Sequence, residues 1–280
     1  MATTATAMPT QAEKAQAFRA LHERESAFII PNSWDVGTAR VLAHLGFGAL
    51  ATTSMGYAFS VGRPDNTLDR EETLAYTSAI ASATGLPVSA NLENGFGDAP
   101  EVVAETIKLV AEAGVVGGSI EDATGRSDHP IYDLELAVER VRAAVEAARS
   151  LPFPFTLTAR AENYLHGRPD LADTIKRLQA YQEAGAHVLY APALASKDDI
   201  AAMIRSVDRP VNVLMGLQGV QLSLAELSAM GVRRVSVGSS LARAAMGAFF
   251  RAAREMREQG TFTFASEAAS PKELTSIFKT

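Results

Sequence analysis

The stretch Pro87-Val88-Ser89-Ala90-Asn91-Leu92-Glu93-Asn94-Gly95-Phe96-Gly97 begins apolar and ends polar and glycine-rich. Its start predicts a buried strand, in which alternate side chains point the same way, so Asn91 and Glu93 face one side together. The two glycines allow a tight turn or a close approach of the backbone to a ligand. A helix is expected over residues 100–113 and a second apolar strand over 115–121. The stretch therefore begins a strand–helix–strand unit.

The same alternation of strand and helix extends in both directions along the chain and gives eight units. Three helix ends are near-copies that each lead into a strand: Ala113-Gly114-Val115, Ala184-Gly185-Ala186 and Met230-Gly231-Val232. Glycine at these positions favours the left-handed backbone conformation that terminates helices. The expected helices of the units span 36–45, 70–83, 100–113, 134–149, 171–184, 197–206, 224–230 and 241–259.

Strands that are apolar on both faces and alternate with helices indicate a parallel sheet with right-handed crossovers. Eight such units predict an α/β fold, the closed (β/α)8 or TIM barrel, as a single domain over residues 1–280. The barrel is expected over about 27–260, after an N-terminal helix at 11–25 and before a C-terminal tail at 261–280 with a short helix over 271–278. An open, doubly wound sheet is the alternative, but the first turn, Asn32-Ser33-Trp34-Asp35, lacks its GxGxxG pattern.

The composition is that of an ordinary globular protein, with 47% hydrophobic and 21% charged residues and a net charge of −6. The negative charge argues against a nucleic-acid or anionic-membrane partner. The chain has no cysteine, which excludes disulfides and cysteine-based catalysis. Residues 1–10 lack the basic start and apolar core of a secretory signal, and no apolar run reaches the roughly 18 residues of a membrane span. We therefore expect a cytoplasmic protein.

Polar residues follow the expected strands at their carboxyl ends, where function gathers in such barrels. Each of them alone could be a helix cap or a turn former, but together they surround one mouth. The candidates are Thr52, Thr53, Ser54, Asp65, Asn91, Glu93, Glu121, Arg160 and Asn212. Oxygen donors favour Mg²⁺ or Mn²⁺ over zinc. Because Arg160 would hold a carboxylate or phosphate, the expected ligand is a small acid with several negative charges.

Six short motifs, taken in order, resemble the isocitrate lyase / phosphoenolpyruvate mutase superfamily, including its methylisocitrate lyase-like and carboxyvinyl-carboxyphosphonate phosphorylmutase-like members. They are Pro31-Asn32-Ser33-Trp34-Asp35, Thr52-Thr53-Ser54, Pro64-Asp65, Asn91-Leu92-Glu93-Asn94-Gly95-Phe96-Gly97, Ile120-Glu121-Asp122 and Thr158-Ala159-Arg160. The resemblance implies a (β/α)8 barrel with Mg²⁺ at its mouth. It also implies a homo-oligomer, a dimer or tetramer, in which the last barrel helix is exchanged between subunits. Members of this superfamily make or break C–C or P–C bonds next to 2-oxo acids.

The resemblance also assigns roles to the candidate residues. Thr52, Thr53 and Ser54 would bind the substrate carboxylate, and Arg160 the substrate's oxygens, with Asn212 as a further substrate-binding residue. Asp65, Glu93 and Glu121 would hold the waters of the metal, and Arg160, Glu121 and Asp65 would form the catalytic set. Asn91 stands where the family places an aspartate that ligates the metal directly. An asparagine carbonyl can still ligate Mg²⁺, but the loss of one negative charge should lower the affinity.

Two further departures narrow the expected reaction. Residues 123–129 contain neither lysine nor cysteine, whereas the isocitrate and methylisocitrate lyases carry a Lys-(Lys/Arg)-Cys-Gly-His loop at this place. We therefore expect an enzyme other than these cysteine-dependent lyases. The loop typical of the mutase is absent as well, which counts against phosphoryl transfer.

The leading hypothesis is a Mg²⁺-dependent lyase that cleaves or forms a C–C bond next to a 2-oxo acid, through an enolate, on a small dicarboxylate. One alternative is P–C bond chemistry on a phosphonopyruvate-type substrate. The other is a protein that binds a 2-oxo acid such as 2-oxoglutarate or oxaloacetate without catalysis.

Overall fold

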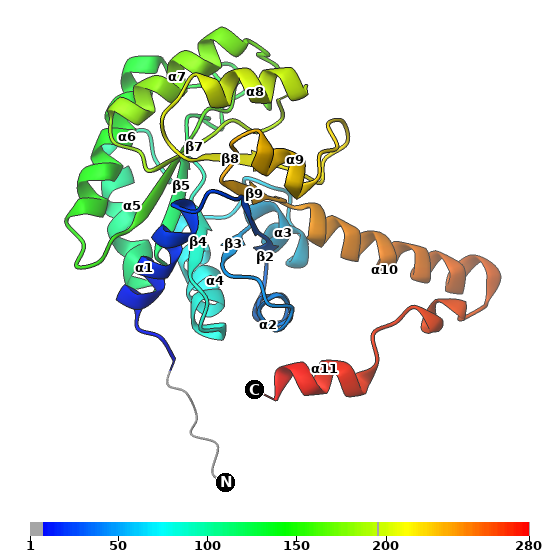
Figure 1. Ribbon diagram of the computed structural model, residues 1–280. Coiled ribbons are helices and arrows are strands. Elements are labelled where there is room, and N and C mark those ends of the chain that lie inside the picture. The colour runs from blue at the N-terminus through cyan, green and yellow to red at the C-terminus, as the bar shows by residue number, and fades with distance from the viewer. Residues whose placement is uncertain (1–7, 195, 280) are drawn as a thin grey trace.

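A computed structural model describes residues 8–194 and 196–279, and residues 1–7, which include most of the segment judged to lack a secretory signal, lie outside these ranges. Within them, nine parallel strands form one sheet with the order β1-β9-β8-β7-β6-β5-β4-β3-β2 (Figure 1). The strands are β1 (Phe28–Ile30), β2 (Asn32–Ser33), β3 (Leu50–Thr52), β4 (Val88–Asn91), β5 (Gly117–Glu121), β6 (Thr156–Arg160), β7 (Val188–Tyr190), β8 (Val211–Leu214) and β9 (Arg234–Ser236).

The first strand is divided at Pro31, and this division closes the barrel. β1 pairs with β9 on one side, and β2 pairs with β3 on the other. Proline has no N–H to donate, but the Pro31 carbonyl still accepts a hydrogen bond from the Ala51 N–H at 3.0 Å. Asn32 joins the two sides, because its Oδ1 accepts from the Val237 and Gly238 N–H groups and its Nδ2 donates to the Thr52 carbonyl. The nine strands therefore fill eight barrel positions, and the predicted barrel is confirmed.

Helices follow the strands as expected, and their bounds differ from the predicted ones by at most one residue. They are α2 (Val36–His44), α4 (Arg70–Ala83), α5 (Pro100–Glu112), α6 (Leu134–Arg149), α7 (Leu171–Glu183), α8 (Lys197–Arg205), α9 (Leu224–Ala229) and α10 (Ser240–Gln259). The extent of the single domain stays a prediction, because both chain ends fall outside the described ranges.

A short helix, α3 (Ser54–Ser60), begins where the sequence suggested only the end of a strand. Thr53 is its N-cap, and the Thr53 Oγ1 accepts a hydrogen bond from the Gly56 N–H at 3.2 Å. The signal that was missed is a Thr-Ser pair directly before residues that can form a helix, since such side chains satisfy the free N–H groups of a first turn. Because of this turn, Ser54 lies over the mouth of the barrel.

The N-terminal helix α1 (Gln11–His22) covers the amino ends of the strands and is three residues shorter at its C-terminus than predicted. Phe18 and Leu21 pack in an apolar cluster with residues at strand starts, such as Phe28 and Val116. A Cβ added at Gly117 would lie 2.8 Å from Phe18 Cε1, so this glycine permits the close approach of helix and strand. Helix α1 therefore packs against the amino ends of the strands, at the end of the barrel remote from the candidate residues.

His22, the last residue of α1, is buried between Phe18 and Phe28, and burial together with the charge of Arg234 lowers its pKa to about 3. The unfolded chain therefore binds a proton at this residue below pH 6.5 that the folded chain does not. We expect the free energy of unfolding to fall as the pH drops from 6.5 toward 3, by about 1.4 kcal/mol per pH unit for this group.

Urea unfolding of the wild type and a His22→Phe variant at several pH values would measure this contribution as the difference between their slopes. The control is His44→Phe, because His44 is exposed on α2. Equal slopes in all three proteins would contradict the assignment.

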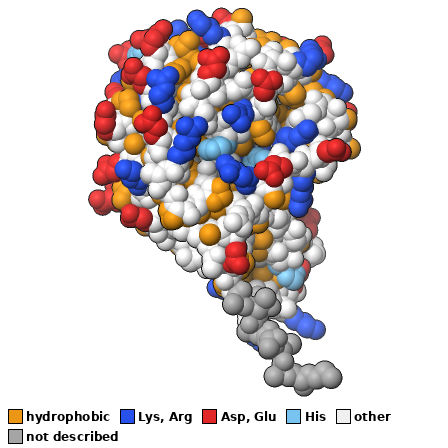
Figure 2. All heavy atoms as spheres, turned by 60° about the vertical axis from the view of Figure 1, so that its left-hand side comes forward, with side chains coloured by type: hydrophobic (Ala, Val, Ile, Leu, Met, Phe, Trp, Pro, Cys, Tyr) orange, Lys and Arg blue, Asp and Glu red, His pale blue; other side chains and the backbone are white. Residues whose placement is uncertain are grey.

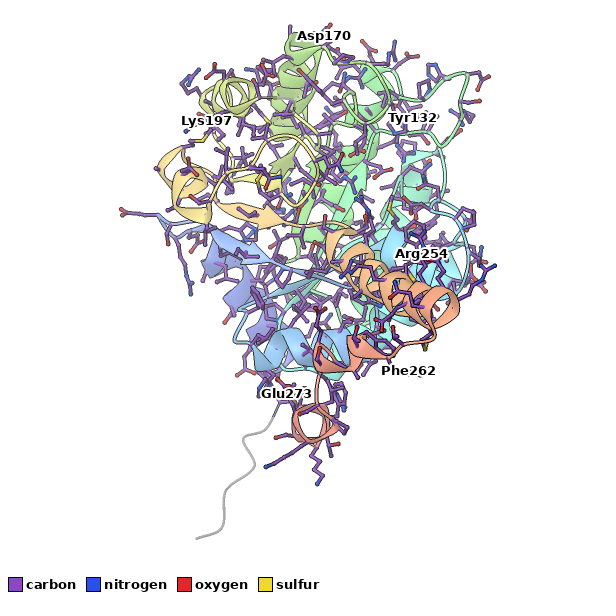
Figure 3. All side chains as sticks on the ribbon, turned by 90° about the vertical axis from the view of Figure 1, so that its right-hand side faces the viewer. Tyr132, Asp170, Lys197, Arg254, Phe262 and Glu273 are labelled. Atoms are coloured by element: carbon purple, nitrogen blue, oxygen red, sulfur yellow. The ribbon has the colours of Figure 1, made fainter. Side chains whose placement is uncertain are left out.

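The C-terminal part of the chain leaves the barrel. α10 extends outward as an arm, and η1 (Thr263–Ser266) and α11 (Pro271–Phe278) lead back to α2 (Figure 1). In Figure 3 the arm carries Arg254 and is followed by Phe262, while Glu273 marks α11. Apolar side chains on the arm and just beyond it are exposed, including Phe249 at 65% and Phe262 at 66%. Exchange of this helix between subunits stays a prediction.

The surface carries charges of both signs. On the face that Figure 2 shows, basic, acidic and apolar side chains are interspersed, as the small net charge would suggest. Within residues 8–194 and 196–279, no helix combines the length and the apolar character needed to cross a bilayer.

Candidate active site

Neighbouring strands bring most of the predicted residues to one mouth. Asn91 ends β4, Glu121 ends β5 and Arg160 ends β6, and Glu121 and Arg160 are directly paired in register. The segments that follow β5, β6 and β7 carry Tyr132, Asp170 and Lys197, which Figure 3 labels. The strand ends thus converge as parallel-barrel geometry requires.

Arg160 is the centre of the arrangement. Its Nη1 lies 3.1 Å from Glu121 Oε2, and its Nε donates to Glu162 Oε1 at 2.8 Å. The side chain is only 12% exposed, and its guanidinium lies 5.1 Å from the centre of the Tyr190 ring. Burial alone would lower the pKa of Arg160, but Glu162 and Glu121 outweigh burial and raise it. Arg160 is therefore a fixed cation in a half-enclosed site.

Asn91 uses both ends of its amide. Its Oδ1 accepts hydrogen bonds from Arg160 Nη1 at 3.0 Å and from Ser119 Oγ at 3.4 Å. Its Nδ2 donates to Ser54 Oγ at 3.1 Å, and Ser54 Oγ in turn donates to Asp65 Oδ1 at 3.3 Å. Asn91 thus connects the cation of the site to the first of its carboxylates.

Burial raises the pKa of three carboxyl groups at the mouth. Burial, followed by repulsion from Asp65, raises the pKa of Glu93 to about 7. Burial also raises the pKa of Glu121 and of Asp65, in each case against an opposing effect of Arg160. Glu93 Oε1 is buried without a hydrogen-bond partner among the described residues. A buried acceptor of this kind is one that a bound cation or water would satisfy.

Thr52, Thr53 and Ser54 form another part of the cavity wall, and the hydroxyls of Thr52 and Ser54 contact other site residues. Thr52 Oγ1 accepts from the Asn91 N–H at 2.9 Å, and Ser54 Oγ contacts Asn91 and Asp65. The Thr53 hydroxyl is used by the N-cap of α3, although Thr53 still lines the cavity.

Asn212 lies deeper than expected, inside the barrel. It is fully buried, and its amide contacts Ser236 Oγ and Arg234 Nε, both at 2.9 Å. Two residues outside the predicted set also take part: Glu162 as an ion-pair partner of Arg160, and Arg234, which is buried below the mouth. Glu162 follows its strand by two positions and could have been included, whereas Arg234 begins a strand and gave no signal.

One cavity of about 210 Å³ joins these groups. Among the predicted residues, its lining includes Thr52, Thr53, Ser54, Asp65, Asn91, Arg160 and Asn212. The lining also includes Arg234 and Tyr190, but not Glu93 or Glu121. The Glu121 carboxylate is placed beside the cavity by its ion pair with Arg160, whereas Glu93 is linked to the lining through its backbone N–H, which donates to Asn91 Oδ1 at 3.3 Å.

The acids suit a hydrated cation better than a fully dehydrated one. Within the described ranges, no three Asp, Glu, His or Cys side chains are close enough together to enclose a metal ion. Mg²⁺ keeps several of its waters and needs only one or two direct protein ligands. Asn91 Oδ1 can serve as a direct ligand in exchange for the hydrogen bonds that it accepts from Arg160 and Ser119. Asp65, Glu121 and Glu93, with its unpartnered Oε1, can accept hydrogen bonds from the waters. The residues present therefore fit Mg²⁺.

The fold is thus a parallel α/β barrel with several acids and a paired arginine at its mouth. The chain belongs to the phosphoenolpyruvate phosphomutase family, whose model matches residues 18–257. The resemblance inferred from the motifs is thereby confirmed.

Individual relatives agree with this assignment. A crystal structure of a protein from Burkholderia cenocepacia J2315, described as a lyase/mutase, is 66% identical, with a TM-score of 0.95 over 96% of this chain and 97% of that chain. The 2,3-dimethylmalate lyase of Eubacterium barkeri is 29% identical over 76% of this chain and 75% of its own length. A crystal structure of phosphonopyruvate hydrolase in complex with oxalate and Mg²⁺ is 25% identical, with a TM-score of 0.84 over 96% of this chain and 95% of that chain. The named relatives are described as a lyase/mutase, a lyase and a hydrolase, and the hydrolase complex supports Mg²⁺ as the cofactor.

Proposed function

We propose that the protein is a Mg²⁺-dependent lyase that cleaves or forms a C–C bond next to the 2-oxo group of a small dicarboxylate. The observation that carries this proposal is the meeting of Asn91, Glu93, Glu121 and Asp65 with Arg160 at one mouth. A relative that acts on 2,3-dimethylmalate and another that binds oxalate with Mg²⁺ support the substrate class and the cofactor.

The acidic residues and Asn91 would bind the cation, and the positively charged Arg160 would bind the substrate. Asn91 would ligate the cation directly, and Asp65, Glu93 and Glu121 would hold its waters. When bound, Mg²⁺ polarises the carbonyl of a 2-oxo acid, which favours breaking the adjacent bond. The Arg160 guanidinium would lie against the oxygen that gains negative charge as an enolate forms, because the arginine is already fixed by Glu121 and Glu162.

The part of the cavity wall formed by Thr52, Thr53 and Ser54 would bind the carboxylate next to the 2-oxo group. The Ser54 hydroxyl and the backbone N–H groups at the start of α3 would bind the substrate carboxylate. Glu93, whose Oε1 is buried without a partner among the described residues, would hold a water of the cation. The site can therefore bind and orient the substrate with its own side chains.

Pyruvate release from oxaloacetate, 2,3-dimethylmalate and other alkylmalates, with Mg²⁺ and with a chelator, tests the proposal. We expect turnover of at least one of these acids that is abolished by the chelator and restored by Mg²⁺. Phosphate release from phosphonopyruvate in the same panel would assign P–C chemistry instead. Binding of 2-oxoglutarate or oxaloacetate in a calorimeter without turnover of any compound would assign a binding protein. The absence of isocitrate and methylisocitrate lyase activity stays a prediction and is checked by adding both acids to the panel.

A further inference from the structure

A second buried arginine lies inside the barrel, below the mouth. Arg234 is the first residue of β9 and is only 5% exposed, yet it lines the same cavity as Arg160. The inward-facing hydroxyls around it include Thr158 and Ser236, so this level of the barrel is polar. Other barrels fill the same level mainly with branched aliphatic side chains.

Arg234 has no acidic partner in the part of the chain that the structure describes. Its Nε donates to Asn212 Oδ1 and its Nη2 donates to Thr158 Oγ1, both at 2.9 Å, and both acceptors are neutral. Its Nη1 is buried with no hydrogen-bond partner. Burial, and then the charge of Arg160, disfavour its protonated form, and the pKa of Arg234 falls to about 10. It still carries its positive charge at neutral pH.

The other buried arginines show that this situation is unusual in the molecule. Arg160 pairs with Glu121 and Glu162, and Arg177 pairs with Asp122 and Asp173. Arg140 lacks a carboxylate but donates to the backbone carbonyls of residues 94, 97 and 98. Burying an unpaired charge is unfavourable, and proteins normally avoid it by pairing.

A ligand that fills the cavity would supply the missing negative charge. We propose that Arg234 binds the second carboxylate of a dicarboxylate substrate, the one remote from the reacting 2-oxo acid end at the mouth. The inference rests on the proposed function, because it takes the 2-oxo acid end to lie beside Arg160. Asn212 and Thr158 hold the guanidinium so that Nη1 remains available to the carboxylate. The residue would thus select dicarboxylates over monocarboxylates.

Two acids with the same head and chain length isolate this contact: 2-oxoglutarate and 2-oxopentanoate, which lacks the second carboxylate. Calorimetric titration in the presence of Mg²⁺ would compare the wild type with Arg234→Met, Arg234→Lys and a matched control, Arg233→Met. Arg233 is adjacent in sequence, but its Nη1 donates to the Glu25 carbonyl outside the cavity.

We expect the wild type and Arg233→Met to prefer 2-oxoglutarate by about 10- to 100-fold, the range for a hydrogen bond to a charged group. Arg234→Met should lose this preference while binding 2-oxopentanoate as the wild type does, and Arg234→Lys should keep part of it. A wild type without the preference, or a preference that survives in Arg234→Met, overturns the inference. If Arg234→Met does not fold, a reduced preference in a folded Arg234→Lys supports the inference, and its full retention there overturns it.

Failure of the proposed function gives a different result. In that case neither 2-oxo acid binds in the presence of Mg²⁺. Titration with succinate, without Mg²⁺, then tests whether Arg234 binds a carboxylate. Succinate binding that disappears in Arg234→Met would retain an anion site at this residue, and no succinate binding to the wild type would overturn it.

Discussion

Replacing Arg160 by methionine is expected to lower kcat/KM by about 10³-fold on any substrate that the protein turns over. Arg160 is the fixed cation next to Asn91, and the removal of one preorganised group that stabilises developing charge has effects of about this size. The same change removes the partner of two buried carboxylates, Glu121 and Glu162. We therefore also expect the free energy of unfolding to fall by about 3 kcal/mol.

The control for lost stability is Arg177→Met. Arg177 is equally buried and pairs with two carboxylates, Asp122 and Asp173, but it does not line the cavity. Steady-state kinetics and urea unfolding of both variants would separate the two effects, since Arg177→Met should lose comparable stability and much less activity. Equal losses of kcat/KM in the two variants would argue that Arg160 acts only through the fold.

Asn91→Asp is expected to raise the affinity for Mg²⁺ by about 10- to 100-fold. A unit charge about 4 Å from another is worth about 4 kcal/mol at an effective dielectric constant of 20, and a large part of this is offset by repulsion from the neighbouring acids. The new carboxylate would occupy the position of an amide that now donates to Ser54 Oγ, which can reverse its own donation.

Titration of Mg²⁺ into the wild type and the variant measures this change. The matched control is Asn94→Asp, which adds the same charge three residues away, where the Asn94 amide donates to the Tyr132 hydroxyl. An unchanged or weaker affinity in Asn91→Asp would show that Asn91 is not beside the cation. Higher Mg²⁺ affinity together with lost turnover would show that the substrate needs the side-chain Nδ2–H group of Asn91.

Much of the fold could be predicted because its signals are repeated. Alternation of apolar runs with helices that end in glycine, as at Gly114 and Gly185, fixes strand and helix positions to within a residue or two. The division of the first strand at Pro31 could not be foreseen, because it depends on which neighbour each half pairs with in space. The helix α3 was missed because its start coincides with the end of β3.

Some residues of the candidate site could likewise be predicted from the sequence, and others could not. Asn91, Glu121 and Arg160 lie at strand ends, where a barrel gathers function, so the fold alone predicts that they meet. Arg234 begins a strand of three residues, too short to show which of two adjacent arginines points inward. Arg234 stands out because it has no acidic partner among the described residues. A sequence alone does not show which charged groups lie near one another in space.

The conformation of Glu93 lowers the stability of the folded protein at a residue of the candidate site. It is held at a φ of 48°, in the left-handed region that costs a residue with a side chain about 1 kcal/mol. Its buried carboxyl oxygen adds a further penalty, because Oε1 has no hydrogen-bond partner. A glycine at this position would remove both penalties and all of the chemistry. We therefore expect the protein to be less stable than its own fold permits, with part of the deficit at the position where we propose that a carboxylate receives a ligand.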